Sequence, residues 1–315
     1  MRLAIIGAGI SGLSCADVLS QAGLDVMVFD KSRGVGGRMS TRRIETHWGA
    51  VSFDHGVQYF TARTRLFEAE VETWATRGHA TRWQSAGCEA WIGYPSMTAP
   101  LKHIAQQHSI ELGCNILGLV RSEETWWLQS EAGRHGPYEA VVVALPPEQA
   151  ASLLSVHDLL MARDAIEARS QPCWTLMVSF DARLDIASDI LRDCGAIAWA
   201  CRNNTKPGRE GPEAWVVQAS ATWSANNISV HPDSVALLLL DALLAARASP
   251  QRAGVSSLTA HRWRYAKAPG LGHGALWNDA IALGACGEWM LGPRVECAWL
   301  SGRMLGRRIV QSMSA

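Results

Sequence analysis

The residues best suited to chemistry lie at the start of the chain, in the turn Gly7-Ala8-Gly9-Ile10-Ser11-Gly12. An apolar run over 2–6 precedes this G-x-G-x-x-G turn, and residues 13–22 follow it with helical spacing. The glycines permit a tight turn, close approach of a pyrophosphate and close packing of helix on strand. A second apolar strand over 25–29 ends at Asp30, where a carboxylate can accept hydrogen bonds from a ribose. The pattern predicts an adenine dinucleotide site.

A second glycine-rich loop with arginines, Ser32-Arg33-Gly34-Val35-Gly36-Gly37-Arg38, follows this acid. Asp30 would repel the 2′-phosphate of NADP, and this does not choose between NAD and FAD. The loop favours FAD, because in flavoproteins the segment after the second strand returns toward the pyrophosphate. Arg38 then neutralises phosphate or fixes the loop, unless it is an ordinary solvated arginine.

Composition excludes several classes of protein. The 315 residues are 48% hydrophobic and 18% charged, which is typical of a folded globular chain and not of a disordered or fibrous one. Lys+Arg 29 balance Asp+Glu 29, so net charge attracts neither nucleic acid nor anionic membranes. The 8 cysteines are scattered, with no C-x-x-C pair, and we expect no secretion signal. We expect a cytoplasmic protein with reduced thiols, and we assign no metal because His47 and His55 lack partners at ligand spacing.

Three further segments complete the predicted nucleotide-binding part. Residues 138–145 indicate a buried strand stopped by two prolines, with a helix beginning near Glu148. Near the C-terminus, residues 280–286 indicate a strand, Gly287-Glu288 a turn, and 295–310 a helix. These pieces predict a parallel sheet covered by helices.

The middle of the chain has a different pattern. Residues 173–180 alternate, with Trp174, Leu176, Val178 and Phe180 on one face, and predict a half-exposed antiparallel strand. Strand patterns recur over 195–201, 214–220 and 256–265, and a core helix is predicted from Val235.

We therefore predict an α/β fold in which a Rossmann-like FAD-binding domain carries an inserted antiparallel-sheet substrate domain. The FAD-binding domain takes residues 1–75, 96–165 and 266–315. The substrate domain takes residues 76–95 and 166–265.

Seven blocks of the chain, in order, resemble the renalase family of FAD-dependent oxidoreductases, especially its bacterial members. The blocks are DKSRGVGGRMSTRR at 30–43, FDHGVQYFTAR at 53–63, WIG at 91–93 with PSM at 95–97, KPGR at 206–209, HRWRYA at 261–266, GEW at 287–289 and GPRVECAWLSG at 292–302. Two positions depart from the usual pattern: Glu288 stands where related flavoproteins have Asp, and Cys297 where a smaller residue is usual.

This resemblance implies a hydroxybenzoate-hydroxylase-like fold with non-covalent FAD. It also implies oxidation of the 2- and 6-dihydro isomers of NAD(P)H to NAD(P)+, after which oxygen reoxidises the flavin and gives hydrogen peroxide. The partners would be a small dihydropyridine nucleotide and oxygen. The cofactor-binding residues expected are Gly7, Gly9, Ser11, Gly12, Asp30, Lys31, Gly37, Arg38, Gly56, Gly287, Glu288, Arg294 and Val295.

The helix that starts near Val295 would point its positive end at the flavin, unless it is a plain packing helix. Cys286 invites a covalent thioether, but burial as a small apolar residue is the simpler interpretation.

Four residues are candidates for the substrate side: His261, Asn203, Gln58 and Tyr59. His261 alternates with Trp263 and Tyr265 along one strand, so the three either line a pocket over the flavin or fill a sheet interior. Asn203 precedes a turn and either binds a carboxamide or serves the turn. A dihydropyridine loses hydride without losing an N–H proton, so no catalytic base is required.

Two alternatives remain at this stage. A flavin amine oxidase shares the two-domain layout and usually places a lysine near the flavin; Lys267 and Lys206 are the candidates. A non-enzymatic FAD-bound binding or redox-sensing protein is the second, with the inserted sheet recognising a partner.

Overall fold

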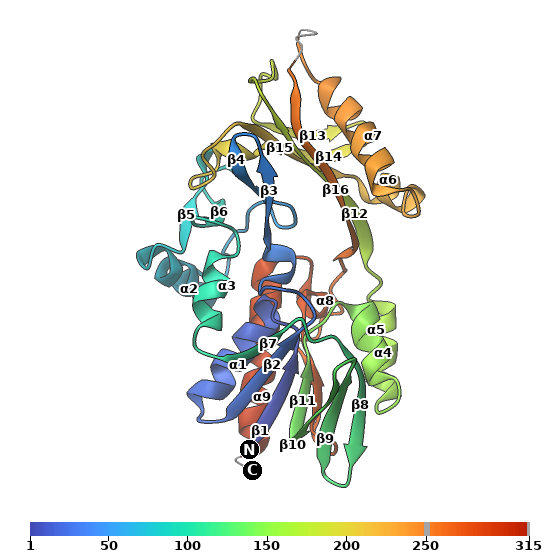
Figure 1. Ribbon diagram of the computed structural model, residues 1–315. Coiled ribbons are helices and arrows are strands. Elements are labelled where there is room, and N and C mark those ends of the chain that lie inside the picture. The colour runs from blue at the N-terminus through green and yellow to red at the C-terminus, as the bar shows by residue number, and fades with distance from the viewer. Residues whose placement is uncertain (249–252, 314–315) are drawn as a thin grey trace.

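Strand β1 (Arg2–Ile6) lies inside a six-stranded sheet in the computed structural model, which describes residues 1–248 and 253–313. Within those residues the strand order is β17-β18-β11-β1-β2-β7, parallel throughout except for β17 (Figure 1). The other strands of this sheet are β2 (Asp25–Asp30), β7 (Ser109–Leu112), β11 (Ala140–Val143), β17 (Leu276–Asn278) and β18 (Leu283–Ala285).

Two long helices cover one face of the parallel sheet, α1 (Ile10–Gln21) and α9 (Val295–Met313). The absence of a side chain at Gly302 lets the two helices approach closely, since a Cβ there would overlap Ser11 O. The Ser14 hydroxyl donates to Trp299 O at 2.9 Å across the same contact. Side chains of β1 alternate between the two faces of the sheet: Leu3 and Ile5 pack against these helices, whereas Ala4 and Ile6 pack on the opposite side.

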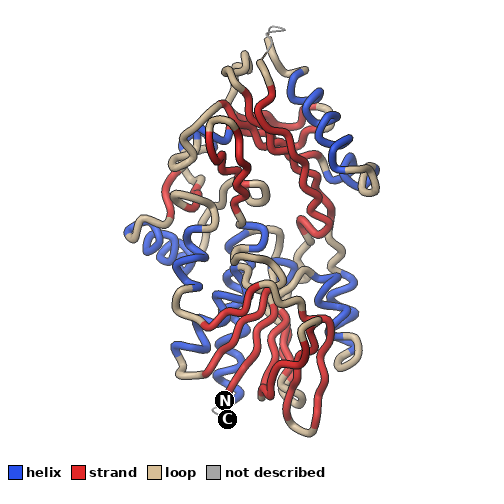
Figure 2. The backbone as a smooth tube through the Cα atoms, viewed as in Figure 1, coloured by secondary structure: helices blue, strands red, loops and turns tan. Residues whose placement is uncertain are grey.

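The opposite face is covered by a three-stranded antiparallel meander and two helices (Figure 2). These elements are β8 (Ile116–Ser122), β9 (Thr125–Ser130), β10 (Gly133–Tyr138), α4 (Pro147–Leu154) and α5 (Leu159–Glu167). The short helix α8 (Glu288–Leu291), from the C-terminal part of the chain, packs into the same core. Trp126 and Leu128 of β9 are fully buried against this face. The sheet is therefore closed on both sides, as a parallel sheet requires.

A second, five-stranded antiparallel sheet lies at the other end of the molecule, in the order β13-β14-β15-β12-β16. Its strands are β12 (Gln171–Phe180), β13 (Ile190–Cys194), β14 (Ile197–Arg202), β15 (Glu213–Ala219) and β16 (Val255–Lys267). Helix α7 (Pro232–Leu244) packs on its outer face, and α6 (Ala221–Asn226) lies at the end of β12 (Figure 1).

Smaller elements connect the two sheets. The hairpin β3 (Thr41–Thr46) and β4 (Gly49–Asp54) contacts the antiparallel sheet through β15 and β16. The remaining elements are α2 (Arg65–Thr76), β5 (Ala80–Arg82), β6 (Trp91–Gly93), α3 (Ala99–Ala105) and the short 3₁₀ helices Gly37–Met39, Gln84–Ala86 and Asn203–Thr205. No helix among the described residues is both long and apolar enough to cross a membrane.

The predicted combination of a parallel, helix-covered sheet with an antiparallel sheet is confirmed. One strand prediction is wrong: residues 173–180 are not half-exposed. Thr175 and Ser179, read as the exposed face, are fully buried because β12 is an inner strand and its second face is also covered.

Some predicted boundaries also shift. Tyr138 ends β10 rather than opening β11, and the strand expected over 280–286 is only Leu283–Ala285. Glu288 begins a short helix where a turn was expected. The predicted domain ranges include residues 249–252 and 314–315, which lie outside the described residues.

Candidate functional site

The glycine turn leaves an open space at the start of α1. A Cβ at Gly7 would overlap Ala144 O, and one at Gly12 would overlap Gly7 O, so these two glycines are required by packing. Gly9, by contrast, has no atom within 4 Å of its Cβ position. Gly9 is also the N-cap, with no side-chain cap and no acidic residue in the first turn. The first N–H groups of α1, which have no partner within the helix, are therefore available to an anion such as a pyrophosphate.

Asp30 anchors the loops around this opening. Its Oδ2 accepts a hydrogen bond from Ala8 N at 2.8 Å, and its Oδ1 accepts one from Ser32 N at 2.7 Å. Gly36 N donates to Ala8 O at 3.0 Å, so the second glycine loop lies beside the first. Gly37 has φ 53° and lies next to Gly9, whereas Lys31 is exposed. The structure thus gathers both predicted glycine loops and the acid at one edge of the sheet.

Arg38 forms a bidentate ion pair with Glu288, although the two residues are distant in sequence. Arg38 also donates to Ala266 O at 3.2 Å, and only 27% of its side chain is exposed, so it is not an ordinary surface arginine. Gly56 lies beside it, because a Cβ there would overlap Arg38 O. Gly287 N donates to the Ser301 hydroxyl at 3.1 Å. Arg38 and Glu288, both predicted to bind the cofactor, therefore lie together.

The start of α9 carries a feature that the sequence interpretation missed. Glu296, in its first turn and 1% exposed, accepts hydrogen bonds from Arg63 N at 3.1 Å and Thr64 N at 2.7 Å. Arg294 lies 3.4 Å from the same carboxylate. The acidic side chain shares the positive end of the helix at Val295, which reduces the field left for a ligand.

The face of the antiparallel sheet opposite α7, here called the inner face, carries a row of four side chains from four strands. Cross-strand pairing aligns Trp199 with Gln218, Gln218 with Thr175 and Thr175 with His261. Gln218 Nε2 donates to Gly56 O at 2.6 Å, so the inner face contacts the segment after β4. A cavity of ≈ 90 Å³ borders this row and is lined in part by Cys173, Trp199 and Gln218.

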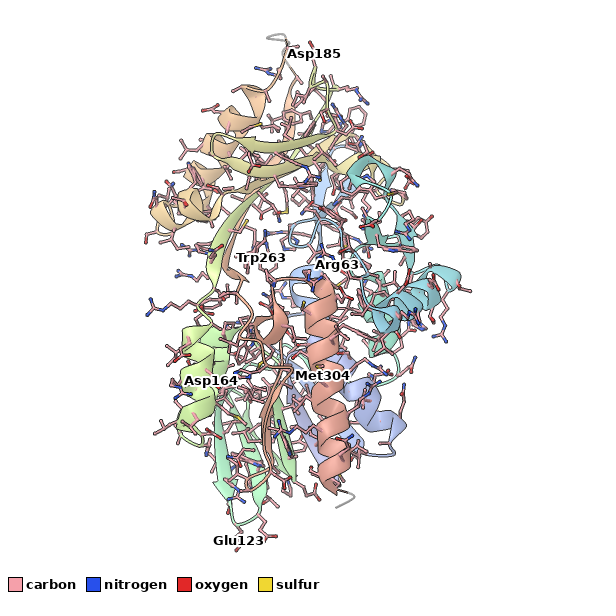
Figure 3. The ribbon with its side chains drawn as sticks, turned by 180° about the vertical axis from the view of Figure 1, so that it is seen from behind. Arg63, Glu123, Asp164, Asp185, Trp263 and Met304 are labelled. Atoms are coloured by element: carbon pink, nitrogen blue, oxygen red, sulfur yellow. The ribbon has the colours of Figure 1, made fainter. Side chains whose placement is uncertain are left out.

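Two histidines meet beside the inner face. The rings of His55 and His261 lie 5.0 Å apart, and His261 lies 4.5 Å from Trp263, whose Nε1 donates to His55 O at 2.8 Å. Figure 3 labels Trp263, which belongs to β16, at about the level of Arg63. Burial, His261 and Arg42 lower the pKa of His55 to about 3. Burial and Arg42 lower the pKa of His261 to about 4, so both rings are neutral at pH 7.

A buried network of charged side chains lies at the end of β4, next to His55. Asp54 Oδ2 accepts hydrogen bonds from Arg209 Nη2 at 2.7 Å and from Lys206 Nζ at 3.3 Å, and none of the three side chains is exposed. Burial alone would raise the pKa of Asp54, but Lys206 and Arg209 outweigh it and hold the pKa below its ordinary value. The network joins β4 to the 206–209 turn.

Gln58 belongs to this network. Its Nε2 donates to Asp54 O and to Gly56 O at 3.1 Å, and its Oε1 accepts from Lys206 Nζ at 3.1 Å. Both ends of the amide are therefore bonded within the protein, and its role in orienting a ring or substrate stays a prediction. The Tyr59 ring lies 5.5 Å from that of Trp199 on the inner face, tilted by 41°.

Asn203 is 1% exposed and donates from Nδ2 to Ser52 O at 2.7 Å, while its Oδ1 has no partner. An unpartnered buried amide oxygen is available to an N–H donor of a ligand. Cys286, in contrast, is fully buried in the core beside α1 and α9, with Cys15 as a neighbouring thiol.

Comparison with known proteins begins with the first segment. Residues 5–69 match the family described as "NAD(P)-binding Rossmann-like domain". The putative oxidoreductase AegA of Escherichia coli (strain K12) is 38% identical over 68 residues, which cover 22% of this chain and 9% of that protein. The L-amino acid oxidase of Cerastes cerastes is 52% identical over 42 residues, which cover 13% of this chain and 8% of that protein. The matches thus span less than a tenth of either relative.

Solved structures match over the whole length. The putative protoporphyrinogen oxidase from Exiguobacterium sp. 255-15 has a TM-score of 0.75 and 11% identity, and the match covers 98% of both chains. An oxidoreductase from Methanosarcina mazei has a TM-score of 0.66 and 12% identity, with 97% of this chain and 99% of that one covered. At these identities the likeness shows a shared fold. The N-terminal segment is of the Rossmann-like dinucleotide-binding type, and these relatives are described as oxidoreductases or oxidases.

Proposed function

We propose that the protein is an FAD-dependent oxidoreductase of the renalase type, which oxidises the 2- and 6-dihydro isomers of NAD(P)H to NAD(P)+ and passes the electrons to oxygen as hydrogen peroxide. The observation that carries the proposal is the chemistry of the inner face: His261 and His55 are both neutral at pH 7, and neighbouring Lys206 is bound in a buried ion pair. Such a surface suits a reaction that needs positioning and no proton abstraction.

The residues at the parallel-sheet edge fit an adenine dinucleotide. The open space at Gly9 admits a pyrophosphate to the α1 N–H groups. Each Asp30 oxygen accepts one backbone hydrogen bond and keeps a second lone pair, which can accept from a ribose hydroxyl. Arg38 and Glu288 would contact the central part of the cofactor, with Arg38 toward phosphate and Glu288 toward a hydroxyl. Burial of Cys286 among apolar side chains supports non-covalent binding. When bound, FAD supplies a hydride acceptor.

The chain's own residues then bind and orient the substrate. His261 and Trp263 present neutral aromatic rings on the inner face, where Cys173, the cross-strand partner of Trp263, lines the cavity. Tyr59 lies beside Trp199, which also lines the cavity. The free Oδ1 of Asn203 would accept an N–H of the nicotinamide carboxamide. Gln58 would hold Asp54 and Lys206 in place through its hydrogen bonds with both. We propose the division into FAD-binding and substrate domains at the ranges given above, and a cytoplasmic location consistent with the free thiols.

The amine-oxidase alternative is less well supported. It needs a lysine near the flavin, but Lys206 is fully buried against Asp54 and Gln58. Lys267 is exposed at the end of β16, beside the same cavity, and is the remaining candidate.

Anaerobic mixing tests the proposal. The yellow holoprotein is mixed with borohydride-treated NAD, which contains the dihydro isomers, with ordinary NADH and with primary amines, and flavin absorbance is followed. We expect rapid bleaching by the isomer mixture and little by NADH or amines. His261→Ala should slow bleaching while FAD stays bound, and His47→Ala, at an exposed histidine, is the matched control.

Bleaching by a primary amine with a rate that rises steeply between about pH 6 and 9 would favour an amine oxidase, because an amine must usually lose a proton first. If nothing bleaches the flavin, the non-enzymatic binding protein becomes the better interpretation. If His261→Ala lowers FAD content but spares the rate, His261 supports the cofactor and not the substrate.

A further inference from the structure

A thiol, an imidazole and a carboxylate converge beside the meander, away from the inner face. Cys114 follows β7, Glu111 lies within β7, and His135 lies within β10. One ligand atom from each lies within 4.8 Å of those of the other two. The three residues are brought together by pairing of β7 with β2 and by the return of the meander over the sheet. None of them takes part in the proposed oxidation.

The spacing of the two softest donors matches a zinc site. Cys114 Sγ lies 3.5 Å from His135 Nε2. At a tetrahedral zinc ion with bonds of about 2.3 Å to sulfur and about 2.1 Å to nitrogen, these atoms lie about 3.6 Å apart. The two donors therefore already stand at ligand separation.

The third donor and the surroundings are also suitable. Glu111 Oε2 lies 3.7 Å from the other ring nitrogen of His135, and 43% of its side chain is exposed, so its carboxylate can rotate toward the thiol. Ser130 Oγ, on a buried residue, donates to Gly133 O and lies 2.9 Å from His135 Nε2, so it accepts the Nε2 hydrogen of the metal-free ring. Zinc would take the place of that hydrogen, which is released as a proton. Packing of the His135 ring edge against Phe29, at 5.1 Å, holds the imidazole in place.

Thiolate, imidazole and carboxylate together prefer zinc among the common divalent ions, whereas magnesium and calcium prefer oxygen ligands alone. We propose that Cys114, His135 and Glu111 form a binding site for a zinc-like divalent ion, with water as the fourth ligand. The site adjoins the cofactor edge, because Cys114 N donates to Asp30 O at 3.0 Å.

Zinc retention by the holoprotein tests this site. The purified protein is stripped with a chelator and dialysed against one equivalent of zinc sulfate with a weak competing chelator, and zinc per chain is then measured by elemental analysis. We expect one zinc per chain, and one sulfur ligand in X-ray absorption at the zinc edge. Loss of a residue that merely orients a metal ligand weakens binding roughly 10- to 100-fold. Cys114→Ser and His135→Ala each remove a ligand itself and should weaken zinc binding by more than that.

The control is the double variant Cys88→Ser/Cys194→Ser, which removes two exposed thiols elsewhere and should leave zinc content unchanged. Flavin content and melting temperature report folding for each variant. Because Cys114 is buried, Glu111→Gln and His135→Gln at partly exposed positions test the site even if Cys114→Ser misfolds.

Three results would overturn the site: no zinc in the wild-type protein, full zinc in folded His135→Ala, or zinc lost only in the double control variant. In each case the cluster is a hydrogen-bonded group that stabilises the meander.

Discussion

In the β1–α1–β2 unit the groups expected to meet a ligand are backbone N–H groups and one carboxylate, around an open space at Gly9. At the end of β4 and in the 206–209 turn, the polar groups are side chains already bonded to one another, as in the pair of Asp54 with Arg209. The first region is built to receive charge from outside. The second has largely neutralised its own charges and presents neutral rings such as His261.

This difference separates two kinds of specificity. A backbone cradle needs glycine at fixed spacing and therefore leaves a mark in the sequence. A side-chain network needs residues that are distant in sequence, such as Asp54 and Arg209, and leaves no local mark. The contrast predicts that substitutions in the second region mainly cost stability, whereas some in the first cost only binding.

The largest effect is expected for Asp54→Asn. The variant leaves Lys206 and Arg209 buried without a counter-charge, which should cost about 3–5 kcal/mol of unfolding free energy. Urea unfolding measures the loss. The control is Asp25→Asn, because Asp25 is exposed and paired with Arg2, which is also exposed, so the change should stay within about 1 kcal/mol. Equal losses of unfolding free energy in the two variants would mean that the buried ion network does not stabilise the protein more than an exposed ion pair does.

Two alanine substitutions within the same glycine turn should separate folding from binding. Gly12→Ala places a Cβ against Gly7 O and should cost about 1–3 kcal/mol of stability or more. Gly9→Ala meets no protein atom and has an ordinary φ of −79°, so stability should change by about 0.5 kcal/mol at most. The same methyl group should obstruct the pyrophosphate and lower FAD affinity at least about tenfold, or 1.4 kcal/mol. Flavin content after dialysis, together with melting curves, checks both variants. Normal FAD binding by Gly9→Ala would place the pyrophosphate elsewhere.

The smallest effect concerns pH. His261 is neutral in the folded protein down to about pH 4, but its unfolded-chain pKa is about 6.5, so the unfolded state binds more protons between these values. Stability is therefore fully present above about pH 6.5 and falls as pH drops toward 4. His261→Gln should reduce that slope by about 0.5–1 kcal/mol per pH unit, less than the about 1.4 kcal/mol of a fully buried histidine, because His261 is partly exposed. Urea midpoints at several pH values measure the slope, and an unchanged slope would contradict the neutral ring.

The parts of the molecule that follow local rules were predictable. The β1–α1–β2 unit follows from strand and helix periods around a glycine turn, and its position was correct to within a few residues. The meander β8–β10 was missed, because its strands mix charged and apolar residues without clear alternation.

Burial on a second face was also not predictable from alternation. Thr175 and Ser179 look solvent-facing in sequence, but both are fully buried on an inner strand, and the Ser179 hydroxyl hydrogen bonds with that of Ser257 at 2.7 Å. The Glu111, Cys114 and His135 cluster was also missed, because His135 is distant in sequence from the other two and is brought to them by the unpredicted meander. The Arg38 and Glu288 pair was predicted only as two separate cofactor contacts.

The order of strands in the two sheets also sets the order in which the protein can fold. All pairings of the antiparallel sheet join residues within 171–267, whereas the parallel sheet must join β1 to β11 and β11 to β18, near the end of the chain. Closing such long loops costs entropy before any contact is gained. We expect the inserted sheet to protect its amides first in pulse-labelling hydrogen exchange. Within this chain the glycine turn that would bind the cofactor precedes the inserted sheet, so it would be made before that sheet and completed after it.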